Sequence, residues 1–388
     1  MDILFFLSRV PWPLDKGDKL RAYHQMRELS AFHRIHLIAL SNRKPTPQTE
    51  KVLLEFCASV RIFPINPLTK LINILKALAQ GKPAQVGYFT KKAIFSDIKN
   101  IGLELHPDLV FFQLVRTAEY AQLFDGKKVM DFQDTLSEGL VRRAEKSKGL
   151  EKWLLEMEAK RMKKYEKKVF EQFNNRVLIT ETDRDIFPHP NREQIIIIPN
   201  GVDLESFKPA GAAQTYDIIF AGNMNYPPNV DAVLFLLNDI MPIVWKRKPQ
   251  TKVLIAGANP AAAIRQKASD LVEITGWVDD ISKAYSSARI FVAPMRIGTG
   301  LQNKLLEAMA SGLPCITSPL AFRPLKATKN SDVLVAETEK DYADLIVELI
   351  DNHIFWQICS LQGRKFVEKN YSWKTVGNQL NDLFRFSV

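Results

Sequence analysis

The chain of 388 residues has little of what marks membrane-spanning or disulfide-built proteins. No hydrophobic stretch approaches the roughly 18 apolar residues that a spanning helix needs. Its three cysteines, Cys57, Cys315 and Cys359, are odd in number and lack metal-ligand spacing, so we expect reduced, buried thiols. The first residues, MDILFFLSRV, are interrupted by Ser8 and Arg9 and favour a buried strand over a signal peptide. These absences predict a cytoplasmic protein.

Repeats, low-complexity tracts and collagen-like periodicity are also missing. The composition, 46% hydrophobic and 25% charged, is that of a globular protein. A chain of this length exceeds one ordinary core, and we expect two domains.

Acidic residues are outnumbered, which gives a formal net charge of +10. Two segments, 68–92 and 142–168, carry much of the excess, and the first places leucines at helical spacing between lysines. Such basic amphipathic segments can lie on an anionic membrane surface, and the alternative is a helix packed on the core with a solvated basic face. Neither segment interleaves stacking aromatics with glycines, so we expect no nucleic acid partner. The localisation we expect is therefore cytoplasmic, with peripheral attachment to the inner face of the plasma membrane as the alternative to a freely diffusing protein.

Short apolar runs alternate with longer helical patterns throughout the chain, which is typical of parallel α/β layers. The predicted strands are 3–7, 35–40, 60–63, 109–112, 129–132, 177–179 and 195–198, then 217–221, 253–256, 272–275, 290–293, 315–317 and 333–335. The segment PNGVDLESFKPAGAAQTYD between the two sets is the predicted linker. We expect one doubly wound domain over 1–199, joined by a C-terminal helix at 372–388, and a second over 200–371. Ligands of such sheets bind at the carboxyl ends of the strands.

The most informative segment is 290–318, IFVAPMRIGTGLQNKLLEAMASGLPCITS. A buried strand leads through Gly298 and Gly300 into a helix expected to begin near Leu301. A helix entered through glycines offers free N–H groups and a positive dipole end to a phosphate. Lys304 and Glu307 lie three residues apart on it and can hold a diphosphate and a ribose, or can simply form its solvated face.

Two further glycine turns are expected near this site. Gly222 and Asn223 follow the strand at 217–221 and precede a helix that Asn229 can cap. Gly276 and Trp277 follow another strand, where a backbone turn beside an aromatic ring can bind a nucleobase. The tryptophan can equally be a core or interface residue.

The first domain has two segments with candidate residues. Gly17, in the loop after the first strand, lets backbone amides approach a phosphate or sugar, and Asp18 is a plausible N-cap of the next helix. Asp131 and Asp134 follow the strand at 129–132 and can orient or deprotonate an acceptor hydroxyl; for Asp134 the alternative is a helix cap.

Five motifs in register resemble the family 4 retaining glycosyltransferases with the GT-B fold: IIIIPNGVDLESF, DIIFAGNMNYPPNVDAVLFL, KVLIAGANP, VEITGWVDD and the segment at 290–318. The stretches PWPLDKGDKLR and KKVMDFQDTLSEG look like the exopolysaccharide-associated sugar transferases within it. The resemblance implies two Rossmann-like domains facing a central cleft, with a nucleotide-sugar donor bound mainly by the second.

The resemblance also implies roles for single residues. Glu307 matches a glutamate that binds the ribose hydroxyls. The other matching positions, which meet the donor through the backbone or hold its base, are Gly17, Gly276, Val278, Trp277, Gly300 and Leu301.

Two positions depart from the family pattern. Thr299 stands where a first glutamate contacts the donor sugar. The Arg and Lys that many members place after the strand at 217–221 are missing, and our hypothesis is that Arg296 and Lys304 neutralise the diphosphate instead.

The function we expect is retaining, metal-independent sugar transfer from a UDP- or GDP-linked donor, without a cofactor, to a glycan or lipid-linked acceptor in exopolysaccharide or other cell-surface glycan synthesis. The alternatives are a degenerate nucleotide-sugar-binding protein, a GT-B epimerase and an inverting transferase.

Overall fold

A computed structural model describes residues 1–42, 45–65, 67–209, 211, 214–298 and 300–387. The chain divides into two compact units, and each is described by itself. Unit 1 comprises residues 1–199 and 376–388, and unit 2 comprises residues 200–375. The described residues form thirteen strands in two parallel sheets, one in each unit, as predicted from the apolar runs.

Unit 1 is built on a seven-stranded sheet of order β3-β2-β1-β4-β5-β6-β7. Its strands are β1 Asp2–Leu7, β2 Arg34–Ser41, β3 Ser59–Pro64, β4 Leu109–Gln113, β5 Lys127–Gln133, β6 Asn175–Leu178 and β7 Ile196–Ile197. Its helices are α1 Gly17–Leu29, α2 Pro47–Leu54, α3 Pro67–Ala79, α4 Ala84–Phe89, α5 Phe95–Leu105, α6 Leu136–Lys146, α7 Gly149–Phe170 and α8 Glu181–Asp185, with short 3₁₀ helices η1 Lys92–Ile94, η2 Val115–Leu123 and η3 Arg192–Gln194.

Unit 2 has a six-stranded sheet of order β10-β9-β8-β11-β12-β13. Its strands are β8 Tyr216–Ala221, β9 Val253–Ala256, β10 Val272–Gly276, β11 Ala288–Ala293, β12 Cys315–Thr317 and β13 Leu334–Val335. Its helices are α9 Pro227–Phe235, the π-helical turn η4 Leu236–Ile240, α10 Met241–Arg247, α11 Ala262–Arg265, α12 Ile281–Ser286, α13 Asn303–Ala310, α14 Pro319–Phe322, the 3₁₀ helix η5 Arg323–Leu325, α15 Glu339–Asp351 and α16 His353–Tyr371. Both sheets have the doubly wound strand order, reversing next to their first strand.

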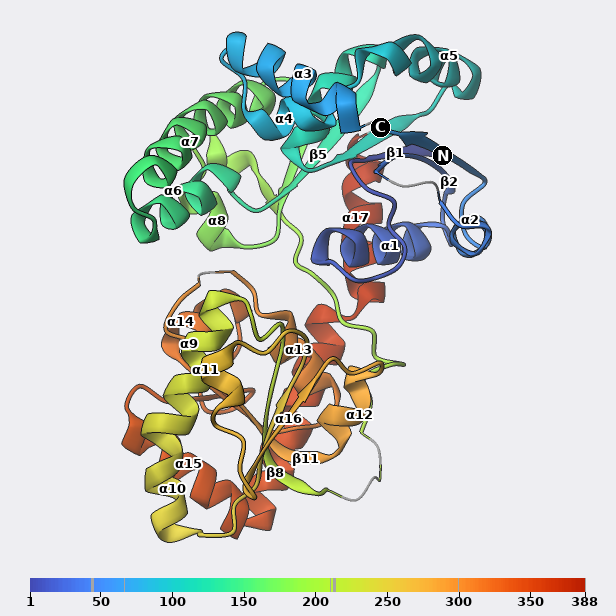
Figure 1. The fold of residues 1–388 in the computed structure, drawn as a ribbon. Coiled ribbons are helices and arrows are strands. Elements are labelled where there is room, and N and C mark those ends of the chain that lie inside the picture. The colour runs from blue at the N-terminus through green and yellow to red at the C-terminus, as the bar shows by residue number, and fades with distance from the viewer. Residues whose placement is uncertain (43–44, 66, 210, 212–213, 299, 388) are drawn as a thin grey trace. The chain divides into compact units, whose positions relative to one another are not determined.

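Helices cover both faces of each sheet (Figure 1), which explains why the strands read as continuous apolar runs rather than alternating ones. In β1, every residue from Ile3 to Leu7 is buried. Phe5 and Phe111 on the paired strands β1 and β4 have ring centroids 4.7 Å apart. Each unit thus has its own apolar core.

The last helix, α17 (Trp373–Ser387), begins in unit 2 and ends in unit 1. Within unit 1 it packs against α1, where the Cβ of an alanine at Gly377 would lie 2.5 Å from Cβ of Glu28. His33 Nε2 and Asn381 Oδ1 are 2.9 Å apart, and the ring of Phe384 lies 5.8 Å from that of Phe111. The helix therefore crosses back to the first domain, as expected.

The two units meet in the sequence between residues 199 and 200, at the start of the predicted linker. Val202 is buried, and its N–H donates to Tyr371 O at 2.7 Å. Arg364 donates to Phe207 O at 2.7 Å. The segment packs against unit 2 because its backbone groups and apolar side chains find partners on α16. Residues 210, 212 and 213 lie outside the described part of the chain.

Cys57, Cys315 and Cys359 are buried free thiols. Of the helices that the structure describes, none combines the length and the apolar character needed to span a bilayer.

Candidate functional site

The carboxyl ends of β8 and β11 mark the point where the strand order of unit 2 reverses. In doubly wound sheets, ligands bind outside the strands at this switch point. The loop after β8 carries Gly222 and Asn223, and the loop after β11 carries Arg296 and Gly298 before α13 begins. The predicted donor residues of these two loops are thus neighbours in the fold.

Glycines line three adjacent strand ends at this edge. Gly222 after β8 has φ 152°, Gly257 after β9 has φ 140° and Gly276 at the end of β10 has φ 71°. A Cβ on Gly257 would lie 1.8 Å from Gly222 O, and the N–H of Gly257 donates to Gly276 O at 3.1 Å. Only glycine fits where these backbones approach so closely. Sequence reasoning missed Gly257 as a site residue, although a glycine directly after a buried strand was a signal for it.

Lys304, in the first turn of α13, reaches across to α9. Its ammonium donates to Asn229 Oδ1 and lies 4.7 Å from the centroid of the Phe220 ring. Asn229 in turn donates through Nδ2 to Asn223 O at 2.9 Å. Burial lowers the pKa of Lys304 to about 8, and the charge of Glu307 counteracts this effect. The described residues form no ion pair with Lys304, so a neutral amide is its direct partner.

The sequence suggested that Asn229 caps α9, but the structure shows that it does not. The helix begins at Pro227 after Tyr226, and the N–H of Asn229 donates to Tyr226 O at 2.9 Å. Its buried side chain instead ties the loop of Asn223 to the ammonium of Lys304.

Glu307 lies one turn after Lys304 on α13. Its Oε2 accepts a hydrogen bond of 2.9 Å from the hydroxyl of Tyr285, a fully buried side chain of α12. Burial raises the pKa of Glu307, while Tyr285 and Lys304 lower it. Tyr285 fixes one oxygen of the carboxylate that we predicted to bind a ribose. Sequence reasoning missed Tyr285, because a buried tyrosine gives no local signal of a partner on another helix.

Arg296 is held differently from Lys304. It donates to both carboxylate oxygens of Asp231, at 3.0 and 2.7 Å, and its guanidinium lies 4.4 Å from the centroid of the Phe235 ring. Asp231 raises its pKa. Both partners are on α9. Arg296 therefore contacts the same helix that Lys304 contacts, but its charge is already paired with Asp231.

The helix predicted to begin near Leu301 begins at Asn303. Gln302 precedes it without a side-chain cap and donates through Nε2 to Gly300 O at 3.0 Å. Extended backbone at Gln302 delays the helix, so Gly300 and Leu301 belong to the loop. Thr299 lies outside the described residues.

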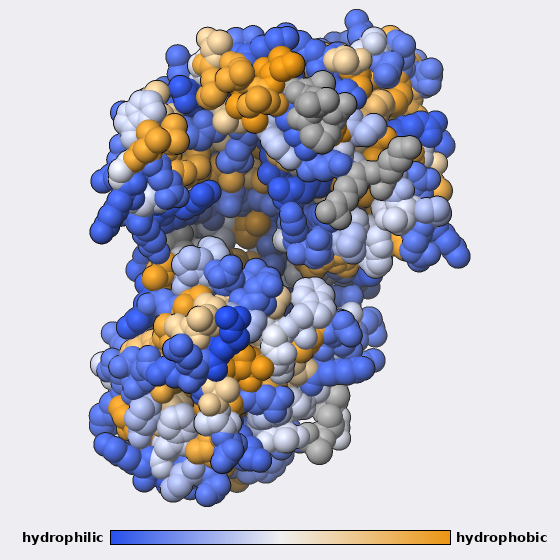
Figure 2. All heavy atoms as spheres, viewed as in Figure 1, coloured by the Kyte–Doolittle hydropathy of each residue, from blue (hydrophilic) through white to orange (hydrophobic). Residues whose placement is uncertain are grey.

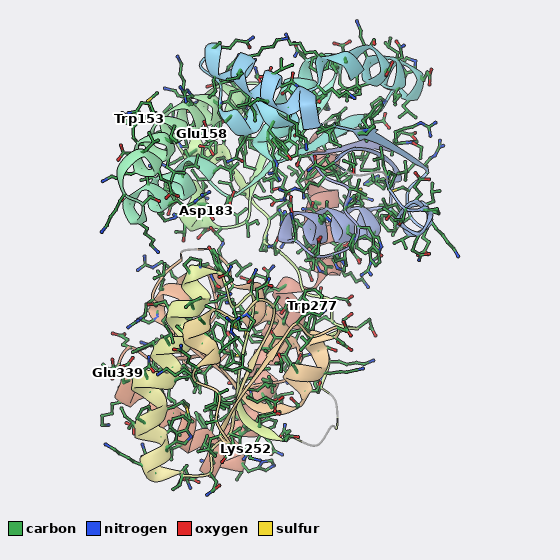
Figure 3. The ribbon with its side chains drawn as sticks, in the orientation of Figure 1. Trp153, Glu158, Asp183, Lys252, Trp277 and Glu339 are labelled. Atoms are coloured by element: carbon green, nitrogen blue, oxygen red, sulfur yellow. The ribbon has the colours of Figure 1, made fainter. Side chains whose placement is uncertain are left out.

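Trp277 is not a core residue of unit 2. Its side chain is 71% exposed, at the surface of the unit (Figure 3), and its Nε1 donates to Asp279 Oδ1 at 3.1 Å. Val278 beside it is half-buried. Because Gly276 also contacts Gly257, this turn adjoins the glycine-lined edge. An exposed indole at that place leaves a free aromatic face.

The switch point of unit 1 lies between β1 and β4. Arg116 donates to Ser8 Oγ at 2.9 Å and to Asp18 Oδ2 at 2.9 Å, and Arg9 donates to the same oxygen at 2.7 Å. The prediction that Asp18 caps α1 is wrong, since α1 begins at Gly17 without a side-chain cap. The carboxylate of Asp18 is engaged by two arginines instead. A Cβ added at Gly17 would point into open space, with no described atom beyond its chain neighbours within 4 Å.

Backbone strain accompanies the next two strand ends of unit 1. Leu114 after β4 has φ 67° and Gln133 at the end of β5 has φ 66°, a region that bulky residues rarely occupy. Such strain costs about 1–3 kcal/mol per residue and collects at functional sites. Asp134 directly follows the strained residue Gln133.

Asp134 is exposed to solvent, yet many protein atoms surround its carboxylate. This environment, together with the charge of Asp183, raises its pKa to about 6. Asp131, by contrast, is fully buried and accepts from Arg21 Nε at 2.7 Å. An acceptor role for Asp131 is therefore wrong, because no substrate can reach it.

The chain resembles known proteins in sequence and in fold. Residues 215–352 match the family model of the group 1 glycosyl transferases. A phosphatidyl-myo-inositol mannosyltransferase of Mycobacterium tuberculosis is 30% identical over 203 residues, covering 48% of this chain and 53% of the relative. A 44.6 kDa protein of the cps region of Klebsiella pneumoniae is 25% identical over 169 residues, covering 41% of this chain and 44% of the relative. The chain thus matches about half the length of these curated relatives.

The fold is shared over the full length with solved structures. The Anabaena Alr3699/HepE structure in complex with UDP superposes with a TM-score of 0.70, covering 100% of both chains at 12% identity. The chain therefore has the GT-B fold, and its second unit carries the group 1 glycosyltransferase family match, as the sequence motifs indicated.

Proposed function

We propose that the protein transfers a sugar, with retention of anomeric configuration and without a metal, from a UDP- or GDP-linked donor to a glycan or lipid-linked acceptor. The observation that carries the proposal is Lys304, a cation at a glycine-lined switch point whose direct partner is a neutral amide. A diphosphate would give Lys304 the direct ionic partner that it has in none of the described residues. UDP in the HepE structure supports the nucleotide donor. The phosphatidyl-myo-inositol mannosyltransferase supports a lipid acceptor, and the relative from a cps region supports a role in surface glycan synthesis.

The chemistry follows from the position of α13. The first N–H groups of a helix have no partner within it, and its N-terminus carries a partial positive charge. Lys304 and these N–H groups would stabilise the charge that develops on the leaving diphosphate as the glycosidic bond breaks. Glu307, oriented by Tyr285, would hold the ribose, and the turn from Gly276 to Val278 would hold the base.

The acceptor hydroxyl must be held on the same face of the sugar as the leaving diphosphate if the configuration is retained. The departing phosphate oxygen can then take the hydroxyl proton, so catalysis is mostly electrostatic and positional. Asp134 is the residue of unit 1 that we assign to orienting the acceptor hydroxyl, or to taking its proton in place of that phosphate oxygen. Arg296 would assist at the diphosphate only after exchanging Asp231 for the ligand.

The proposal is tested by thermal shifts with UDP, GDP and their sugars, followed by turnover with the donor that stabilises best. NMR of the product should show the donor's anomeric configuration, and turnover should withstand EDTA. Binding without turnover across donors and acceptors would favour a degenerate binding protein, and an inverted product would contradict the retaining mechanism.

A further inference from the structure

Helix α3 of unit 1 turns apolar side chains to solvent. Leu71, Ile72 and Leu75 are 64%, 53% and 59% exposed, whereas Ala77 faces inward and is buried. These three leucine and isoleucine residues fall at i, i+1 and i+4, which places them on one side of the helix. In Figure 2, hydrophobic residues gather over α3 in unit 1. An amphipathic surface helix normally buries this stripe, so the exposed stripe needs a partner.

The segment that contains this stripe carries charge of one sign. No Asp or Glu occurs between Glu55 and Asp97, while six cations do: Arg61, Lys70, Lys76, Lys82, Lys91 and Lys92. Lys76 and Lys92 are exposed to solvent. A face that joins exposed leucines to unopposed lysines matches the interface of an anionic bilayer, where apolar groups enter the acyl boundary and cations meet phosphates.

A cavity of about 140 Å³ lies between α3 and α4, beside the stripe. Its lining includes Lys76, Lys82, Lys92 and Gly87, with Glu119 holding Lys82 at 2.6 Å. No carboxylate of the described residues pairs with Lys76 or Lys92, so these two lysines are available to an anion. The place of this cavity next to exposed leucines suits a phospholipid headgroup.

Helix α7 extends the face. Leu150, Trp153 and Leu154 near its start are 70%, 54% and 52% exposed. Helix α4 connects the two patches, since it packs on α3 and the N–H of Gln85 donates to Glu158 of α7 at 3.4 Å. Trp153 lies at the surface of this part of unit 1 (Figure 3). Tryptophan favours the level of the lipid headgroups.

We propose that the α3–α4 face of unit 1, extended by the start of α7, docks on an anionic lipid bilayer. The leucines of α3 enter the acyl boundary, and Lys76 and Lys92 contact lipid phosphates. A second copy of the chain is the weaker occupant, because two identical basic faces would repel each other. This proposal goes beyond sugar transfer, since vesicle binding requires no nucleotide sugar.

Co-sedimentation with phosphatidylcholine vesicles, with and without phosphatidylglycerol, tests it. The wild-type chain should bind the anionic vesicles, and the double variant Leu71→Ser/Leu75→Ser should lose about tenfold in partitioning. Lys76→Ala/Lys92→Ala should lose about 25-fold in partitioning, about fivefold per lysine, and its binding should become less sensitive to salt. Trp153 fluorescence should shift to the blue on binding, by comparison with Trp153→Phe.

Matched controls come from α16 of unit 2, where Ile354 and Leu361 are 70% and 55% exposed. Ile354→Ser/Leu361→Ser and Lys365→Ala/Lys369→Ala should bind vesicles as the wild type does, and all variants should melt at similar temperatures. The proposal is overturned if the α3 variants bind as the wild type does, if inorganic phosphate binds but vesicles do not, or if the apolar variant only converts a dimer to a monomer. An unshifted Trp153 spectrum would remove α7 from the docking face.

Discussion

The two switch points of this molecule have the same strand topology and opposite electrostatics. In unit 2, glycines clear the strand ends, and among the described residues Lys304 donates to a neutral amide, lies against an aromatic ring and forms no ion pair. In unit 1, the carboxylate of Asp18 already pairs with Arg9 and Arg116. The carboxylate of Asp134, near Arg116, is accessible to solvent. In our proposal, one edge receives an anion, and the other presents a carboxylate beside cations that are already paired. The topology locates a site, and the pairing of its charges determines its chemistry.

The sharpest way to break this comparison is to close the glycine-lined edge. Gly257→Ala should destabilise the protein by about 3 kcal/mol or more, because it forces a left-handed backbone on a residue with a Cβ and places that atom against Gly222 O. Nucleotide-induced thermal shifts should disappear. Thermal melting and urea unfolding measure the effect.

Gly17→Ala is the matched control in unit 1, where the new Cβ meets open space. Its stability should stay within about 1 kcal/mol of the wild type. A Gly257 variant as stable as the Gly17 variant would contradict the close packing of the three strand ends.

The second test removes the unpaired charge. Lys304→Met should lower donor kcat/KM by about 10²–10³-fold, because the leaving diphosphate loses its cation, while the fold is kept by an apolar side chain of similar length. Lys283→Ala on α12, an exposed lysine of the same unit, is the control. Steady-state kinetics and nucleotide titration measure both. Unchanged turnover and affinity would remove Lys304 from the donor site.

The third test addresses unit 1. Asp134→Asn should lower kcat by about 10²-fold if the carboxylate takes or orients the acceptor proton, and it should leave nucleotide affinity unchanged. Asp185→Asn, an exposed carboxylate on α8, should have no effect. If Asp134→Asn instead weakened nucleotide binding with kcat intact, its assignment to the acceptor would be wrong.

The fold could be predicted from the sequence because buried parallel strands appear as short apolar runs between glycine or proline turns. The strands at 253–256 and 315–317 match β9 and β12 residue for residue. Helix starts were less predictable: Asp18 and Asn229 are residue types that cap helices, yet long-range partners take their side chains. Tyr285 could not be assigned because its role depends on a contact between α12 and α13, whereas Gly257, which directly follows a buried strand, could have been.

The pH profile compares the two edges in one experiment, with the smallest expected effect. Lys304, with a pKa near 8, is protonated below that pH, and a bound diphosphate favours this form. Donor affinity should therefore fall by up to about tenfold per pH unit above 8, and Lys304→Met should abolish the dependence. Asp134, with a pKa near 6, must be ionised to accept a proton, so turnover should rise as the pH increases through 6 and be flat in Asp134→Asn. A nucleotide sugar is the better probe, because it lacks the secondary phosphate ionisation near pH 6 that free UDP adds. If one substitution removed both limbs of the profile, the two edges would not titrate independently, and the division of roles between the units would fail.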